Sequence, residues 1–178
     1  MKIYSFILLS VIVFNCKKKP VFQVKEERET GSTITIRDYE RTSYDTEGKL
    51  KWKLFSKETY YFNEQSKTII YNVYVEQYEG STIKAKVWAD KGMILQAENL
   101  MKLEGNVKII TNDGKQFETE ELTYNTDEQI IRSDKKVTIQ LKRTIIRGIG
   151  FEADKNLNKY KILKPEAVSI GTNPLKDN

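Results

Sequence analysis

One cysteine and a complete lack of histidine limit the chemistry available to this chain. Cys16 is the only cysteine among 178 residues, so neither an internal disulfide nor a cysteine-rich metal site can form. Without histidine, the commonest general base and every Ser-His or Cys-His arrangement are missing. Paired acids such as Glu120-Glu121 and Asp127-Glu128 lack a basic or nucleophilic companion and are interpreted as solvated surface. We therefore expect a protein that is not an enzyme and uses no metal or cofactor.

The position of Cys16 indicates covalent lipid attachment. Residues 1–15 combine a positive head with an apolar stretch shorter than the roughly 20 residues of a membrane span, which predicts a signal peptide. The following Val13-Phe14-Asn15-Cys16 resembles a lipobox, although Asn15 replaces the usual small residue. A diacylglycerol on the thiol with an N-acyl group would anchor the mature chain stably. An uncleaved membrane anchor and an ordinary signal peptide with an incidental cysteine are the alternatives.

Charge and composition describe the rest of the exported chain. Residues 16–32 are polar and aperiodic and predict a tether, and residues 171–178 predict a flexible tail. Charged residues make up 31% with a net charge of +5, and export makes nucleic acid an implausible partner. Lys17-Lys18-Lys19 would attract anionic lipid head groups beside the anchor, or would serve only as a solvated linker.

Residues 33–170 carry the pattern of β-strands almost throughout. Apolar and polar residues alternate, and Ile, Val, Thr and Tyr are frequent, as half-buried pleated surfaces prefer. Three turn sequences separate the stretches, namely Asp45-Thr46-Glu47-Gly48, Glu79-Gly80-Ser81 and Asn112-Asp113-Gly114. No window carries a convincing helical face. The sequence therefore predicts a single all-β domain.

The chain also repeats itself at a spacing of about 30 residues. Residues 89–109 and 119–139 end alike, with Val107-Lys108-Ile109 and Val137-Thr138-Ile139. Residues 150–170 form a third copy, and residues 55–75 form a looser fourth. We expect each unit to hold a strand, a turn, a strand and a connecting strand, and to stack on its neighbours because it cannot bury its apolar face alone. Chance self-similarity of alternating strands is the alternative.

Several short motifs, in order along the chain, resemble the LptC family of lipopolysaccharide-export proteins. The carboxy-terminal half carries Leu103-Glu104-Gly105-Asn106-Val107, then Thr119-Glu120-x-Leu122-x-Tyr124 and Arg147-Gly148-Ile149-Gly150. The amino-terminal half carries Tyr44-Asp45-x-Glu47-Gly48-x-Leu50-x-Trp52-x-Leu54 and Trp88-Ala89-Asp90-Lys91. The resemblance spans roughly Asp38 to Ile170 and each motif alone is degenerate.

The resemblance implies a fold, a ligand and partners. The fold would be an open twisted β-jellyroll, a stacked β-hairpin sandwich that accepts the lipid A acyl chains of lipopolysaccharide. The partners would be an inner-membrane ABC transporter complex and a periplasmic bridge protein of the same β-fold, like LptA. Known members of the LptC family are usually anchored in the membrane by an uncleaved transmembrane helix. This chain is instead expected to be lipid-anchored at the periplasmic face of the inner membrane.

Shielding acyl chains from water requires an apolar inner face, and burial would contribute about 25 cal/mol per Å². The inward members of the alternating strands are the candidates: Trp52, Leu54, Ile69, Tyr71, Val73, Val87, Leu103, Val107, Ile109, Val137 and Ile139. The alternative is an envelope lipoprotein with a closed β-sandwich core, acting as a scaffold or adhesin.

Partner docking is expected at the free edges of the sheet, where unpaired backbone groups recruit another strand. The onward contact is predicted around Tyr160 to Ile170 and the transporter contact around Thr33 to Arg37. Lysines such as Lys159 and Lys161 could instead block the edge.

Overall fold

The computed structural model describes residues 27–170 of the chain. The predicted signal peptide, Cys16, most of the tether and the predicted tail lie outside the described residues. Every described strand belongs to the compact unit Gly31–Asn178. Within residues 27–170, no helix is long and apolar enough to cross a membrane.

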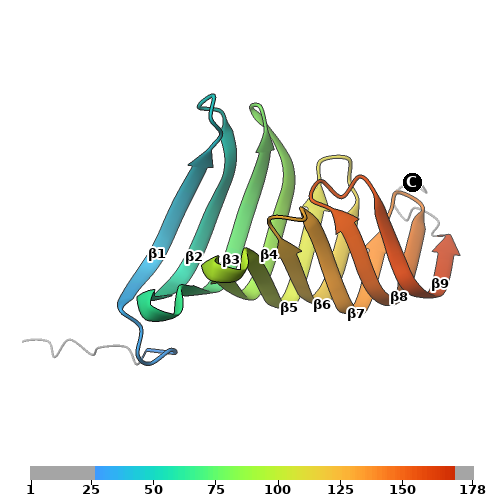
Figure 1. The fold of residues 1–178 in the computed structure, drawn as a ribbon. Coiled ribbons are helices and arrows are strands. Elements are labelled where there is room, and N and C mark those ends of the chain that lie inside the picture. The colour runs from blue at the N-terminus through green and yellow to red at the C-terminus, as the bar shows by residue number, and fades with distance from the viewer. Residues whose placement is uncertain (1–26, 171–178) are drawn as a thin grey trace, which may run out of the picture. The chain divides into compact units, whose positions relative to one another are not determined.

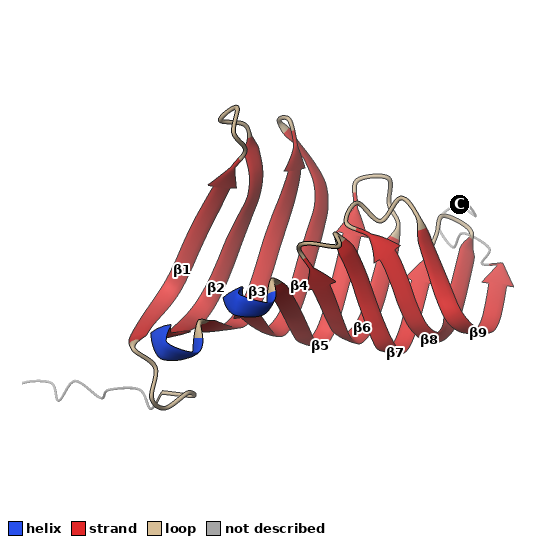
Figure 2. Ribbon diagram, viewed as in Figure 1, coloured by secondary structure: helices blue, strands red, loops and turns tan. Residues whose placement is uncertain are grey.

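In the described part of the chain, nine strands form one antiparallel sheet in which each strand pairs with the next along the chain (Figure 1). They are β1 (Ile34–Tyr44), β2 (Leu50–Phe62), β3 (Lys67–Glu79), β4 (Thr82–Leu95), β5 (Leu100–Thr111), β6 (Gln116–Asn125), β7 (Ile130–Gln140), β8 (Thr144–Asp154) and β9 (Tyr160–Ile170). Two short 3-10 turns, η1 (Asn63–Gln65) and η2 (Gln96–Glu98), are the helical elements of the described chain (Figure 2). The predicted all-β fold class is confirmed.

The predicted turn sequences connect β1 to β2, β3 to β4 and β5 to β6. In the first of them, the carboxylate Oδ1 of Asp45 accepts hydrogen bonds from the backbone N–H groups of Glu47 and Lys49, at 2.9 and 2.8 Å. Gly48 follows with a φ of 77°, which a residue without a Cβ adopts at little cost. A short polar side chain and a glycine therefore reverse the chain within a few residues.

The sheet is folded on itself along a line that crosses the middle of the strands, here called the crease. The pairing register is irregular at mid-strand, for example between Ser133 and Lys136, and Asn72 has a positive φ there. The ring centroids of Phe117 in β6 and Phe151 in β8 lie 5.6 Å apart, although β6 and β8 are not neighbours in the sheet. The halves of the strands on either side of the crease therefore pack face to face as two layers.

The repeats correspond to hairpins of this folded sheet. Residues 55–75 contain most of β2, η1 and the first part of β3, and residues 89–109 contain the same parts of β4, η2 and β5. Residues 119–139 and 150–170 hold the equivalent parts of β6 with β7 and of β8 with β9. The expected connecting strand in each unit is wrong, because each repeat contains parts of only two strands, and the second of these crosses the crease. The recurring Val-x-Ile endings therefore lie on odd-numbered strands beyond the crease.

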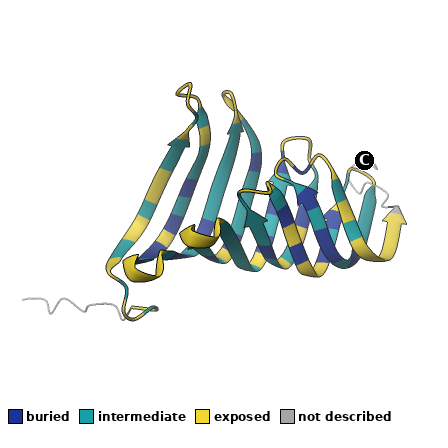
Figure 3. Ribbon diagram, in the orientation of Figure 1, coloured by how far each residue is buried: buried dark blue, intermediate teal, exposed yellow. Residues whose placement is uncertain are grey.

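Burial is greatest in the middle of the sheet and smallest at its edges (Figure 3). Ile139 in β7 is 0% exposed, which a single open sheet could not achieve without a covering layer. At the edge, β9 is exposed over most of its length, and Val168 is 64% exposed. The apolar core thus lies between the two layers, and its ends are set by β1 and β9.

Candidate functional site

The inner face of the folded sheet is a continuous apolar surface that runs from β2 to β8. Its buried members belong to one cluster, to which Trp52, Val87 and Leu103 add half-buried side chains. Nine of the predicted lipid-binding residues lie in or against this cluster: Trp52, Leu54, Val73, Val87, Leu103, Val107, Ile109, Val137 and Ile139. Their burial is a property of the fold, and their binding of a lipid stays a prediction.

Ile69 and Tyr71 do not lie on this surface, so their predicted place on the inner face is wrong. Ile69 belongs to a second cluster with Tyr60 and Phe62, and Tyr71 packs against it. The neighbouring Ile70, which points the opposite way from Ile69, is the β3 residue in the main cluster. The cause is the crease: Asn72 has a φ of 54°, and this turn of the backbone reverses the alternation between Tyr71 and Val73.

Several inner-face residues were absent from the sequence prediction. Phe117, Leu122, Ile131 and Phe151 are all at most 8% exposed and belong to the main cluster. Phe117 and Leu122 lie on opposite sides of the crease, with three glutamates and a threonine between them. Simple alternation along β6 therefore does not place both side chains on the same face. The aromatic residues offered the better signal, because each large apolar ring in a strand tends to be buried.

The inner face is more open near β2 to β4 than near β7 and β8. Trp52, Val75 and Val87 are only half-buried, whereas Val137 and Ile139 are at most 3% exposed. Side-chain size contributes to this difference, because β4 supplies the small residues Ala85, Ala89 and Gly92 to the interior. We call the region of β2 to β4 the open end of the inner face.

Aromatic rings fill the other end, here called the closed end. The centroid of Phe117 lies 5.6 Å from that of Phe151 and 5.5 Å from that of Tyr160, and the centroids of Phe151 and Tyr160 lie 6.3 Å apart. Such edge-on and tilted arrangements stabilise aromatic clusters beyond their area burial. An apolar ligand could enter this end only if the rings or their neighbours moved.

Leu157, in the turn between β8 and β9, completes the closed end. Its side chain is 4% exposed and belongs to the main cluster, yet its φ is 58°. Burying a leucine contributes about 1.5–3 kcal/mol, and a left-handed backbone at a residue other than glycine costs about 1–3 kcal/mol. The two contributions are of similar size, so burial of the side chain roughly offsets the cost of the left-handed backbone.

The outer face carries an aromatic ladder across three strands. Phe55 and Tyr74 have ring centroids 5.8 Å apart, and Tyr74 and Trp88 have centroids 5.3 Å apart. The hydroxyls of Tyr74 and Tyr78 donate to the carboxylate of Glu76, at 2.7 and 2.6 Å. Burial and then the bond to Glu76 raise the pKa of Tyr74 to about 12, and the two hydroxyls hold the pKa of Glu76 below its ordinary value. We interpret this network as cross-strand stabilisation.

The two edges of the sheet expose backbone and apolar side chains. Ile34 in β1 and Leu163 in β9 are 49% and 52% exposed. Pro165 lies in the middle of β9 and has no N–H, and the register with β8 shifts next to it, which interrupts this edge. The Nζ of Lys161 lies 3.0 Å from a carboxylate oxygen of Glu152 in β8, so this lysine is held on the strand behind it.

Chemistry other than apolar burial has little support in residues 27–170. No group of three or more Asp, Glu, His or Cys side chains within that range is placed to hold a metal ion. The paired acids take part in surface ion pairs, such as Glu121 with Lys102 at 3.1 Å and Glu128 with Arg132 at 2.6 Å. Exposed pairs of this kind contribute little to stability.

Comparisons with known proteins agree with this architecture. A solved structure with a similar fold is LptH from Pseudomonas aeruginosa, described as the LptA homologous periplasmic component of the conserved lipopolysaccharide transport device. The TM-score is 0.50 at 10% sequence identity, over 77% of this chain and 96% of that chain. Curated protein sequences give no match. A family model described as lipopolysaccharide-assembly, LptC-related, matches residues 3–165. The chain therefore belongs to the LptC-related family of lipopolysaccharide-assembly proteins.

Proposed function

We propose that this protein is the lipopolysaccharide-binding component of an export machinery. It receives lipopolysaccharide from an inner-membrane ABC transporter and passes it to a periplasmic bridge protein of the same β-fold. Family membership and the LptA-like fold support the role in lipopolysaccharide transport. The observation that carries the proposal is the apolar surface that runs across the sheet from β2 to β8, next to the edge strands β1 and β9, which each pair with only one strand within residues 27–170.

Acyl chains would bind first at the open end of the inner face. Trp52, Val75 and Val87 are half-buried there and keep apolar surface that a chain could cover. Each methylene removed from water contributes about 0.8 kcal/mol, so a few chains supply enough affinity for transfer between carriers. Because no covalent step is involved, the direction of transport would come from the transporter.

Partners would extend the sheet at its edges. We assign the onward contact to β9 and the transporter contact to the start of β1, around Thr33 to Arg37. Exposed Leu163 and Val168 on β9 support the first assignment, since apolar side chains on a free strand favour strand addition. A lipid on Cys16 would keep the protein at the periplasmic face of the inner membrane, within reach of both partners.

Photocrosslinking in cells tests the proposal directly. A photoreactive amino acid at Trp52 or Val87 reports on the inner face, and the same probe at Lys53 or Lys86 is the matched control on the outer face. We expect lipopolysaccharide adducts at the two inner positions and none at the lysines. Equal labelling of both faces would mean surface adsorption, and would contradict a carrier groove.

The closed end favours a second candidate function. Because Val107, Val137, Ile139 and Phe151 are at most 3% exposed, the domain could be a closed sandwich that acts as a scaffold or adhesin. In that case, a folded and exported protein would give no lipopolysaccharide adduct at Trp52 or Val87. The same experiment therefore separates the two functions.

A further inference from the structure

The turn that carries Leu157 differs from three other turns in the same sheet. The turns after β2, β4, β6 and β8 each contain one residue other than glycine with a positive φ, namely Ser66, Asn99, Gln129 and Leu157. The first three directly precede the next strand, whereas Leu157 lies earlier in its turn, ahead of Asn158 and Lys159. The first three are polar and exposed, as a solvated turn favours. Leu157 is instead apolar and 4% exposed, between the exposed residues Asn156 and Asn158. Only in the last turn does the side chain fold into the core.

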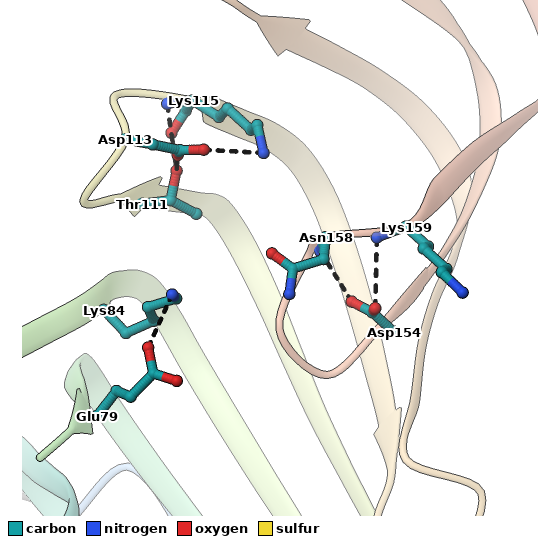
Figure 4. A network of polar contacts seen from close by, with 8 residues as sticks. All are labelled: Glu79, Lys84, Thr111, Asp113, Lys115, Asp154, Asn158 and Lys159. Atoms are coloured by element: carbon teal, nitrogen blue, oxygen red, sulfur yellow. Dashed lines mark hydrogen bonds and ion pairs between the residues drawn. The ribbon is translucent and has the colours of Figure 1, made fainter.

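The β8–β9 turn is held by a few local polar contacts. The carboxylate of Asp154 accepts hydrogen bonds from the backbone N–H groups of Asn158 and Lys159, at 2.9 and 3.3 Å (Figure 4). The N–H of Leu157 donates to the carbonyl of Asp154 at 3.0 Å, and the N–H of Lys155 donates to the carbonyl of Gln129 at 3.1 Å. None of these bonds belongs to the strand ladder of β8 and β9, so a movement of the turn would break them without requiring a break in that ladder.

A hollow lies beside the turn. A cavity of about 600 Å³ is lined by the stems of the turn, including Asp154, Asn156 and Tyr160, and by Glu128 on the neighbouring turn. It also reaches Ala153, a member of the main cluster. The volume lies within the range of about 300–1,000 Å³ that is typical of ligand pockets. Leu157 itself does not line the hollow; it lies in the main cluster, as Ala153 does, while Asn156 on one side of it in the chain and Lys159 on the other line the hollow.

We propose that Leu157 is a gate at the closed end of the inner face. In the lipid-free protein its side chain fills the end of the core, and when an acyl chain advances toward β9 the turn moves outward and the acyl chain takes its place. This inference rests on the proposed function, and it places the gate next to the edge assigned to the onward partner. The burial of the side chain favours the closed state, and contacts with an acyl chain would replace that burial when the turn moves outward.

Cysteine accessibility tests the gate in the full chain. Leu157→Cys is compared with Asn156→Cys, an exposed neighbour, and with Ala153→Cys, a buried position on β8. The proteins are held in phospholipid vesicles, and alkylation by a maleimide is measured peptide by peptide, with and without purified lipopolysaccharide. Local opening governs the reaction of a buried thiol. Without lipopolysaccharide, we expect the thiol at position 157 to react about ten-fold more slowly than the thiol at position 156. With lipopolysaccharide, position 157 should react several-fold faster while position 153 stays slow.

The outcomes separate the gate from the proposed function. If a photoprobe at Val87 captures lipopolysaccharide while position 157 stays protected, the carrier function holds and the gate is wrong. If position 157 reacts as fast as position 156 without lipopolysaccharide, Leu157 closes nothing and the gate is also wrong. If no lipopolysaccharide is captured at Val87, both proposals fail.

A second variant tests the gate without a new thiol. Leu157→Gly removes the side chain and the conformational cost of the positive φ. We expect lipopolysaccharide capture by a photoprobe at Tyr160, at the closed end, to rise several-fold relative to capture at Val87. Unchanged or reduced capture at Tyr160 would overturn the gate.

Discussion

Replacing Gly148 in β8 with alanine should detach the edge strand β9. A Cβ at this position would lie 2.5 Å from the carbonyl oxygen of Lys164, 2.5 Å from Cγ2 of Ile162 and 3.0 Å from Cα of Pro165. Ordinary contacts begin at 3.4 Å, so the backbone of β9 must withdraw by about 0.9 Å. The side chain of Ile162 could rotate away, but the backbone atoms could not.

The size of the effect follows from this displacement. Adding about 0.9 Å to hydrogen bonds of about 2.9 Å takes them beyond hydrogen-bond length. Overpacking costs about 1–3 kcal/mol and each lost bond about 1 kcal/mol, so Gly148→Ala should lower the free energy of unfolding by about 2–4 kcal/mol. Urea unfolding measures this change, and amide hydrogen exchange should show faster exchange confined to β8 and β9.

The control is Gly114→Ala in the β5–β6 turn. Gly114 has a φ of 83° and its Cβ would meet nothing within 4 Å, so only the backbone conformation opposes the substitution. We expect a loss of about 1–2 kcal/mol with no effect on the exchange of β9 amides. If Gly148→Ala unfolds at the same urea concentration as the wild type, or destabilises no more than Gly114→Ala, the steric reasoning is refuted.

Three further predictions concern the core, the aromatic ladder and the pH range of stability. Ile139→Ala should lower the free energy of unfolding, measured in urea, by about 2–5 kcal/mol. The control Ile110→Ala, at a half-buried position, should lower it clearly less. Equal losses for the two variants would argue against a core between the layers. Because the pKa of Tyr74 is raised from 10.0 to about 12, its contribution to stability should be complete below pH 10 and disappear between pH 10 and 12. The pKa of Tyr61 is also raised to about 12, so Tyr74→Phe should remove one of the phenols that titrate near pH 12 in an absorbance titration and leave the titration of Tyr61. Since the pKa of Glu76 is lowered from 4.5, the contribution of its carboxylate to stability should be present above pH 4.5 and lost as the pH falls further. In acid-unfolding curves, Glu76→Gln should abolish this loss.

The sequence could predict the strands and most of the inner face because alternation is a local property. Val107 and Ile109, or Val137 and Ile139, lie on one side of the crease, where the pleat alone decides which side chains face inward. Turn residues such as Gly48 likewise identified their hairpins from local chemistry. These predictions needed no knowledge of how the sheet folds on itself.

The crease could not be predicted from alternation, and it accounts for the errors. At Asn72 the backbone turns within a strand, so Ile69 and Tyr71 exchange faces with their neighbours. The clue was the asparagine itself, since Asn tolerates a left-handed φ better than most residues, and Asn106 marks the crease in β5 in the same way. Burial of Leu157 was equally hidden, because a leucine within a polar turn gives no periodic signal.

The hairpin repeat makes the length of the apolar surface adjustable in discrete steps. Each repeat adds two strands, and neighbouring strands are about 4.8 Å apart, so one more hairpin would lengthen the surface by close to 10 Å. The crease would continue through the added strands, so the distance between the layers would stay the same. Duplication or loss of one unit is therefore a route by which evolution can match such a protein to acyl groups of different number, while the terminal strands β1 and β9, and any partners fitted to them, remain unchanged.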